Sequence, residues 1–183
     1  MISRRLLRLV LTICGVVSLT CFAPAQTKTD ASLRERLTGA WRLVSIETIR
    51  PSGEIIYPFY GKHPQGLILY DRSGWMSVQI ASDPAPAVPA VDSREGFAAA
   101  SVAEKAKAAE GYYAYEGTWT LDVENSTVTH HIKQSLVPGE RGADFLRHLS
   151  VEGDRLTLIA KIHEMGEDHQ RRLVWQRVST EQP

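Results

Sequence analysis

The sequence predicts an all-β fold, a single antiparallel up-and-down β-barrel with a short N-terminal helix and one inserted helix. From Trp41 onward, short segments rich in β-branched and aromatic residues recur roughly every 10 to 15 residues. Each segment ends at a cluster of Gly, Pro, Asn or Asp, and nearly every connection has hairpin length. Short strands joined by such turns form an antiparallel meander, which closes on itself more readily than it stacks into layers.

The expected strands follow from these segments in order. Turn sequences such as Asp71-Arg72-Ser73-Gly74 and Glu152-Gly153-Asp154 separate them. The strands are predicted at about residues 40–49, 54–59, 66–71, 75–81, 112–122, 127–136, 144–151, 155–163 and 170–178.

Two helices are expected outside the sheet. The first covers residues 30–37, with Leu33 and Leu37 on one side, and leads into the first strand. The second covers about residues 94–110, where Ser93 supplies an N-cap and Gly111 a stop. Because its apolar stripe is thin, we expect this inserted helix to lie over an opening of the barrel and not in the core.

The alternation of side chains along each strand predicts which of them face the barrel interior. The pattern is clear in residues 155–163, where Leu156, Leu158, Ala160 and Ile162 share one face. It stays ambiguous in residues 170–178 and in residues 41–49, where Trp41 and Leu43 compete with Val44 and Ile46.

An aromatic-lined cavity is the candidate binding site, since ligand pockets combine apolar walls with a few polar groups. Any of these aromatic residues could equally be ordinary core, because small barrels fill much of their interior with side chains. The candidate ligand-binding residues are Tyr113, Tyr115, Trp119, His130, Arg147 and Trp175.

Two polar members of this set have specific chemistry. His130 shares a face with Val128 and Ile132, so it is a hydrogen-bonded core histidine, a polar anchor for a ligand, or a catalytic acid or base. Arg147 shares a face with Phe145 and Leu149, and an inward arginine would favour a ligand with a carboxylate or enolate, because a buried charge needs a partner.

The first 25 residues form a candidate signal peptide. Arg4, Arg5 and Arg8 precede an apolar run from Leu9 to Phe22, which is followed by Ala23-Pro24-Ala25, an A-x-A cleavage site. The run is shorter than the roughly 20 residues that a membrane-spanning helix needs. We therefore expect export to the periplasm or the medium, cleavage after residue 25, and a mature barrel domain over residues 26–183.

The mature chain excludes several classes of function. Its 158 residues carry 18 of the 21 basic residues, all 21 acidic ones and neither cysteine, so its formal net charge is −3. Because it has no cluster of basic residues, we do not expect it to bind nucleic acid or an anionic membrane surface. No motif for a cofactor, metal or nucleophile occurs: adjacent strand residues His130 and His131 point to opposite faces and cannot easily share one metal. The oligomeric state stays open.

The ordered blocks of the sequence resemble one known family. Gly39-Ala40-Trp41 looks like the G-x-W start of the first lipocalin strand, and residues 66–79, which read GLILYDRSGWMSVQ, resemble a hairpin of the bacterial and fungal lipocalin-like domain family. The blocks YAYEGTW (113–119), VTHHI (128–132), RLTL (155–158) and LVWQR (173–177) match later parts of that family. The resemblance covers roughly residues 33–178. It implies a lipocalin-like barrel in which Trp41 and Arg177 close one end.

These observations lead to one expected function and two alternatives. The barrel, its aromatic residues and the missing catalytic signature favour a protein that binds or carries a small, largely hydrophobic molecule. The first alternative is a barrel enzyme, a cyclase, isomerase or hydratase, acting on a small apolar substrate. The second is a filled structural or partner-binding envelope protein. A cavity inside the barrel would distinguish the binding protein and the enzyme from the filled barrel.

Overall fold

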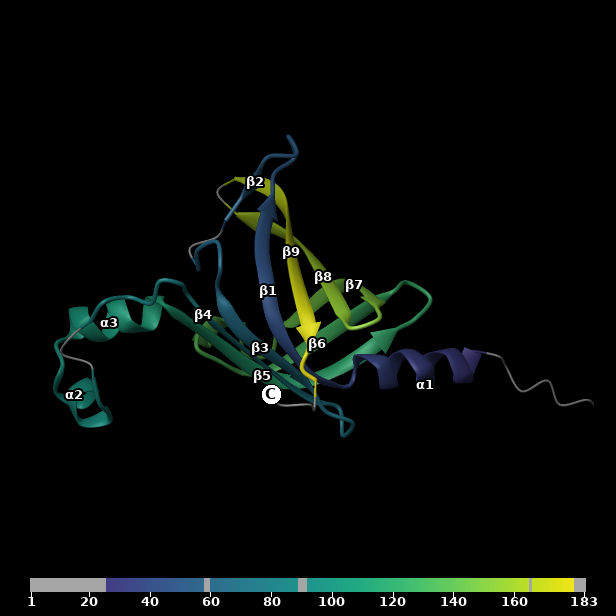
Figure 1. Ribbon diagram of the computed structural model, residues 1–183, viewed down its shortest axis with the longest axis horizontal. Coiled ribbons are helices and arrows are strands. Elements are labelled where there is room, and N and C mark those ends of the chain that lie inside the picture. Colours follow the sequence, from purple (N-terminus) through teal and green to yellow (C-terminus); the bar gives the residue numbers. More distant parts are fainter. Residues whose placement is uncertain (1–25, 58–59, 89–91, 165, 180–183) are drawn as a thin grey trace, which may run out of the picture.

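A computed structural model describes residues 26–57, 60–88, 92–164 and 166–179, so the expected signal segment lies outside the described residues. The chain forms one antiparallel sheet in which each strand pairs with the next along the chain, except that β2 is a short addition to β1. β1 also pairs with β9, which closes an eight-stranded barrel (Figure 1). The strands are β1 (Gly39–Ile49), β2 (Ile55–Ile56), β3 (Gln65–Tyr70), β4 (Trp75–Ala81), β5 (Tyr112–Asp122), β6 (Thr127–Ser135), β7 (Asp144–Glu152), β8 (Arg155–Glu164) and β9 (Glu167–Arg177). The predicted fold class is confirmed.

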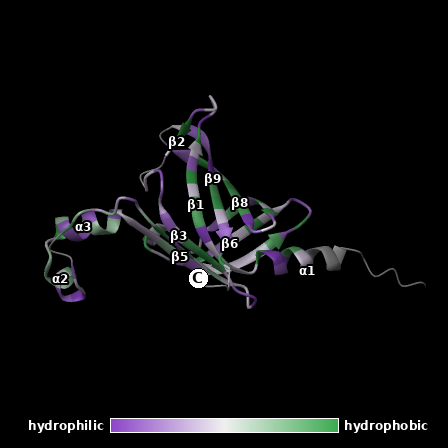
Figure 2. Ribbon diagram, viewed as in Figure 1, coloured by the Kyte–Doolittle hydropathy of each residue, from purple (hydrophilic) through white to green (hydrophobic). Residues whose placement is uncertain are grey.

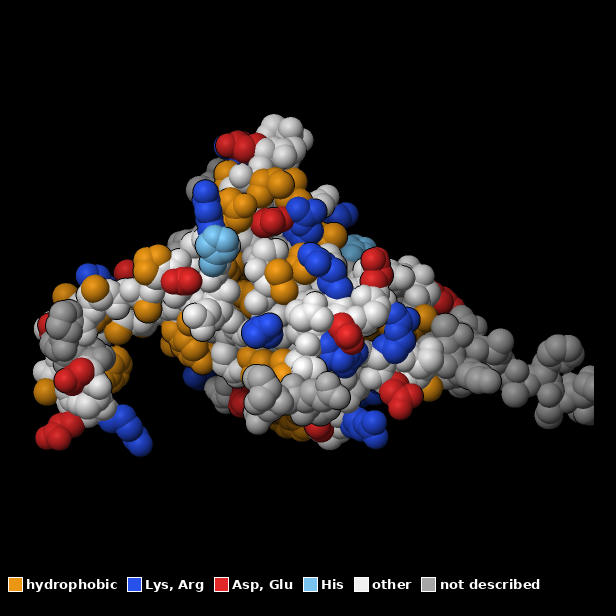
Figure 3. Space-filling model, viewed as in Figure 1, with side chains coloured by type: hydrophobic (Ala, Val, Ile, Leu, Met, Phe, Trp, Pro, Cys, Tyr) orange, Lys and Arg blue, Asp and Glu red, His pale blue; other side chains and the backbone are white. Residues whose placement is uncertain are grey.

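Alternating side chains from the strands build the core inside the barrel. In β4 the buried residues are Met76, Val78 and Ile80, and in β8 Leu156 and Leu158 are buried on the face that the sequence predicted. Hydrophobic and hydrophilic positions alternate along the strands (Figure 2). The outer face carries interspersed acidic and basic side chains (Figure 3), as where Arg172 of β9 meets Glu47 of β1.

A β-bulge in β1 resolves the ambiguous parity of that strand. The pairing of β1 with β9 shifts register between Leu43 and Ser45. Trp41 and Leu43 face the core before the shift, and Ile46 and Thr48 are buried after it. Because a bulge inserts one residue, the inward face moves from odd to even positions. In β9 the inward set is the one that contains Leu173 and Trp175.

The segment after β1 differs from its prediction. We expected a strand over residues 54–59, but β2 covers Ile55–Ile56, which pair with Ile49 and Thr48. Residues 58–59 lie outside the described residues. β3 then pairs with β1 only at the other end, over Gly39–Arg42. The middle of β1 therefore has β9 on one side and no strand partner on the other within the described residues.

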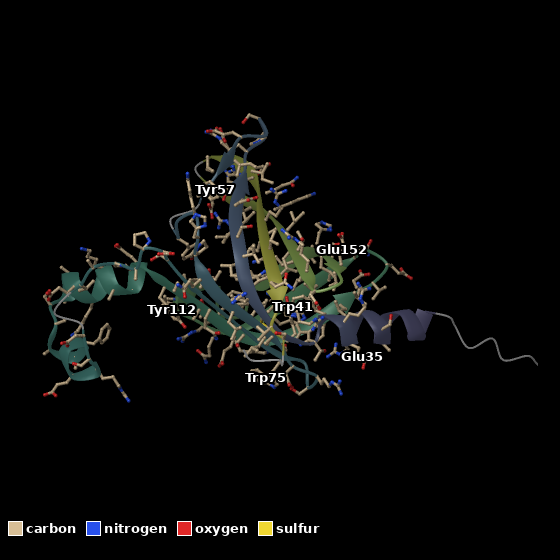
Figure 4. The ribbon with its side chains drawn as sticks, viewed as in Figure 1. Glu35, Trp41, Tyr57, Trp75, Tyr112 and Glu152 are labelled. Atoms are coloured by element: carbon tan, nitrogen blue, oxygen red, sulfur yellow. The ribbon has the colours of Figure 1, made fainter. Side chains whose placement is uncertain are left out.

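One end of the barrel is closed at the C-terminal part of α1 (Gln26–Leu37), where Leu37 is fully buried and Leu33 packs against the core. Trp41 lies on β1 near the end of the barrel that α1 joins (Figure 4). Its indole Nε1 donates to the carbonyl of Leu37 at 2.8 Å, and the guanidinium of Arg177 lies 4.0 Å from its ring. Arg34 of α1 lies 4.0 Å over Trp119 in the same way. The expected Trp41–Arg177 pair is confirmed.

The inserted helical segment is two helices, α2 (Arg94–Ala99) and α3 (Val102–Glu110), and not one helix over 94–110. Ser93 caps α2, and Gly111 ends α3, as predicted. The break occurs because Ser101 forms a capping box with Glu104, which starts a new helix. Neither helix has a buried residue among those described, and both project away from the barrel (Figure 1) instead of lying over its opening.

No described helix is both long enough and apolar enough to cross a membrane.

Candidate functional site

A cavity of about 1030 Å³ occupies the barrel and opens at the end opposite α1. Apolar side chains from the strands form its walls, and the mouth is bordered by Tyr57 and Tyr60 after β2, by Ala109 of α3 and by Leu136 and Val137 after β6. Small-molecule sites in proteins typically have volumes of roughly 300–1,000 Å³. A barrel with this much space is not filled by its own side chains, which disfavours the filled structural alternative.

The structure brings five of the six predicted site residues together around this cavity. They are Tyr113, Tyr115, His130, Arg147 and Trp175. Trp119 is not among the lining residues, because β5 runs from the mouth toward the closed end and places it near that end. There its Nε1 donates to the carbonyl of Asp71 at 3.2 Å, and its ring meets Tyr70 edge-on at 5.2 Å. Whether the five residues bind a ligand stays a prediction.

His130 lies in the wall of the cavity between two tyrosines. Its Nε2 is 2.7 Å from the hydroxyl of Tyr70, and its Nδ1 is 2.9 Å from the hydroxyl of Tyr115. Burial lowers the pKa of His130 well below its ordinary value, and the nearby charge of Arg147 lowers it further. The imidazole is therefore neutral, and both of its nitrogens are hydrogen-bonded, as in a core histidine.

Tyr115 joins this histidine to the cavity. Burial raises the pKa of Tyr115 to about 12, against the opposing positive charge of Arg147. The hydroxyl consequently keeps its proton at physiological pH, so Tyr115 is a hydrogen-bond donor as well as an acceptor. Its ring stands edge-on to Phe145 at 5.7 Å, which holds it in place.

Arg147 lines the cavity, as do four other charged strand residues, Asp144, Lys161, Glu164 and Arg171. It lies on β7 with its guanidinium 5.1 Å from the Phe145 ring, and its Nη1 donates to the carbonyl of Leu146 at 3.1 Å. By contrast, Glu47 forms an ion pair with Arg172 on the outer face, and Glu116 is exposed. Within the described residues, Arg147 has no carboxylate partner.

Sequence reasoning missed a polar group near the mouth. Glu140, in the short helix η1 (Pro138–Glu140), accepts hydrogen bonds from Tyr113 at 2.7 Å and from Ser135 at 2.6 Å. Burial raises the pKa of Tyr113, and the bond to Glu140 adds to the increase. Tyr60, 6.4 Å from the Tyr113 ring, lies beside them. Because Glu140 stands in a turn, strand alternation gave no signal for it.

Sequence reasoning also missed Tyr70, the second hydrogen-bond partner of His130, which lies toward the closed end of the barrel. Its place in the inward set of β3 was readable from the alternation with Ile68. The contact itself joins residues 60 positions apart in the chain, and no local pattern reports such a pairing.

A metal site is not formed by the residues that the structure describes, because no three of their His, Cys, Asp or Glu side chains gather closely enough to hold an ion. The polar groups of the cavity can instead donate and accept hydrogen bonds, and Arg147, Lys161 and Arg171 bring positive charge to its lining.

The model of the family described as "Lipocalin-like domain" matches residues 38–178. No curated protein matches the chain.

Proposed function

Because the chain belongs to the family of lipocalin-like domains, whose barrel suits ligand binding, we propose that it holds a small, largely hydrophobic molecule in the barrel. The observation that carries this proposal is the cavity of about 1030 Å³, whose lining is predominantly apolar. Residues of several loops border its mouth.

The expected affinity follows from the area that such a ligand would bury. Removing about 400 Å² of apolar surface from water contributes roughly 10 kcal/mol. Association costs at least about 4 kcal/mol. The remaining free energy corresponds to a dissociation constant of roughly 10–100 μM before any polar contact is added.

The proposal includes export. The order of positive, apolar and small residues in the first 25 positions supports a signal peptide, and both cysteines lie within that segment. After cleavage the exported protein would contain no cysteine and could form no disulfide bond. A chain of this size can be stabilised by its hydrophobic core without one.

An enzyme is the second candidate, favoured by the neutral imidazole of His130 beside the Tyr115 hydroxyl at the cavity wall. Such a pair could move one proton on a bound apolar substrate in a cyclase, isomerase or hydratase. Chemical change of the bound molecule on incubation would distinguish this candidate from a carrier.

Tryptophan fluorescence tests the carrier proposal. Trp175 lines the cavity, whereas Trp75 is 51% exposed outside the barrel. A long-chain fatty acid or an aromatic polyketide should quench the fluorescence saturably. Trp175→Phe should remove most of this quenching, and the matched control Trp75→Phe should leave it intact. If a broad panel of apolar compounds gives no saturable quenching, or if only Trp75→Phe removes it, the proposal is wrong.

A further inference from the structure

Hydrogen-bond accounting around His130 fixes the direction of two bonds. A neutral imidazole has one N–H and one lone pair. The hydroxyls of Tyr70 and Tyr115 lie on its two nitrogens, at 2.7 and 2.9 Å. One tyrosine must therefore donate its proton to the ring, and the other must accept the ring's proton.

Tyr70 is the tyrosine that donates. Its side chain is 1% exposed, and among the described residues His130 is the one hydrogen-bond partner of its hydroxyl. If Tyr70 accepted from His130 instead, its own proton would be buried without an acceptor, which is costly in a closed interior. Nε2 therefore accepts from Tyr70, and Nδ1–H donates to Tyr115.

The hydroxyl proton of Tyr115 is then left for another acceptor. Tyr115 lines the cavity, and its ring neighbours are Tyr113 at 5.5 Å and Phe145 at 5.7 Å. No described residue accepts this proton in a hydrogen bond. The proton is thus available to a molecule in the cavity.

Arg147 is a second donor on the same wall. It lines the cavity together with Tyr115 and His130, and its positive charge lowers the pKa of both of these side chains. The backbone carbonyl of Leu146 takes one of its five N–H donors. Arg147 lines the cavity, and a guanidinium without a carboxylate partner there favours an anionic ligand.

The carboxylates that line the cavity do not supply this partner. Each of the three is bound elsewhere: Glu140 by Tyr113 and Ser135, Asp144 by His131, and Glu164 by Arg171. The wall at Arg147 therefore presents donors and a positive charge, without a matching acceptor among the described side chains.

We infer that Arg147 and Tyr115 form a binding site for an oxyanion, so that the ligand is an apolar molecule with a carboxylate or enolate head group. This inference rests on the proposed function and adds the chemical class of the ligand. The guanidinium supplies charge and a fork of donors, Tyr115 supplies one directed donor, and Tyr70 through His130 positions that donor. The apolar remainder of the ligand extends along the walls toward the mouth.

Matched pairs of probes test the inference on protein produced from the full-length chain. The first pair is cis-parinaric acid and its methyl ester, and the second is an apolar β-diketone and its enol ether. Charge-assisted hydrogen bonds should make the acid bind about 10–100-fold more tightly than the ester. A preference within the second pair alone would identify the head group as an enolate.

Three variants separate the roles. Arg147→Gln should bring the affinity for the acid close to that for the ester, and Tyr115→Phe should lower it by up to about tenfold. In both variants the affinity for the ester should change less than about threefold. The control Arg172→Gln removes an arginine from the outer face, where it pairs with Glu47, and should leave the preference unchanged.

The outcomes distinguish the two proposals. If neither pair of probes shows a preference, or if Arg147→Gln and Tyr115→Phe keep the full preference, the oxyanion site is wrong while the carrier function stands. If no probe binds saturably to the wild-type protein, the carrier function itself fails. If Arg147→Gln does not fold, Tyr115→Phe tests the oxyanion site by itself. This variant removes only the hydroxyl oxygen and keeps the aromatic ring.

Discussion

Replacing Trp41 by alanine should destabilise the barrel by about 4–5 kcal/mol. Trp41 is fully buried, and truncation of a buried tryptophan to alanine costs roughly 3–5 kcal/mol through lost burial and cavity formation. The upper part of this range applies because two specific contacts are lost as well. They are the 2.8 Å hydrogen bond from Nε1 to Leu37 and the stacking of Arg177 at 4.0 Å.

Denaturant unfolding followed by fluorescence measures this loss from the midpoint and slope. Trp41→Phe should cost less, about 1–2 kcal/mol, since it keeps a ring but loses the hydrogen bond. A double-mutant cycle with Arg177→Ala should give a coupling of about 0.5–2 kcal/mol. A loss below about 1 kcal/mol for Trp41→Ala, or strict additivity in the cycle, would refute the assignment of this pair as the plug of the closed end.

Three further predictions concern other parts of the chain. N-terminal sequencing of the exported protein should begin at or near Gln26, and recovery of the intact chain from the cytoplasm would contradict the signal peptide. Burial lowers the pKa of His130 in the folded protein, so the unfolded chain takes up a proton at a higher pH than the folded protein does. The free energy of unfolding should therefore be highest above about pH 6.5 and should decrease as the pH falls below that value. The imidazole NMR signals of His130 should stay those of the neutral ring as the pH is lowered through 6.5, and a titration of His130 near pH 6.5 would disprove this. Gly117→Ala places a Cβ 2.0 Å from a backbone oxygen and should cost about 1–3 kcal/mol in thermal melts, whereas Gly139→Ala meets open space and should change little.

Strand positions and most inward faces could be predicted because alternation and turn residues are local signals. Leu156 and Leu158 show this, since their face is buried as the sequence indicated. The bulge in β1 could not be predicted, because its register shift depends on pairing with β9 across the closed sheet. The sequence therefore offered two competing faces, Trp41 with Leu43 against Val44 with Ile46. In the structure Trp41 and Leu43 are buried before the bulge and Ile46 after it, whereas Val44 is exposed.

The break between α2 and α3 had a readable signal. Ser101 and Glu104 have the spacing of a capping box, but the alanine-rich residues on both sides suggested one continuous helix. The inward direction of Arg147 was readable from its neighbours on β7. That Arg147 has no carboxylate partner could not be predicted, because this depends on which residues Glu140 and the other acidic residues of distant segments bind in the folded protein.

The closed end has a kinetic consequence for any molecule held inside. Arg177 and α1 block one end, so the barrel is a blind tube with its entrance at the other end. A second molecule cannot push the first out from behind, and the resident must leave before a new one enters. Exchange should therefore be dissociative, with a release rate that does not depend on the concentration of the competitor. Handover to another protein would require that protein to act at the mouth, where the loops after β2 and β6 meet.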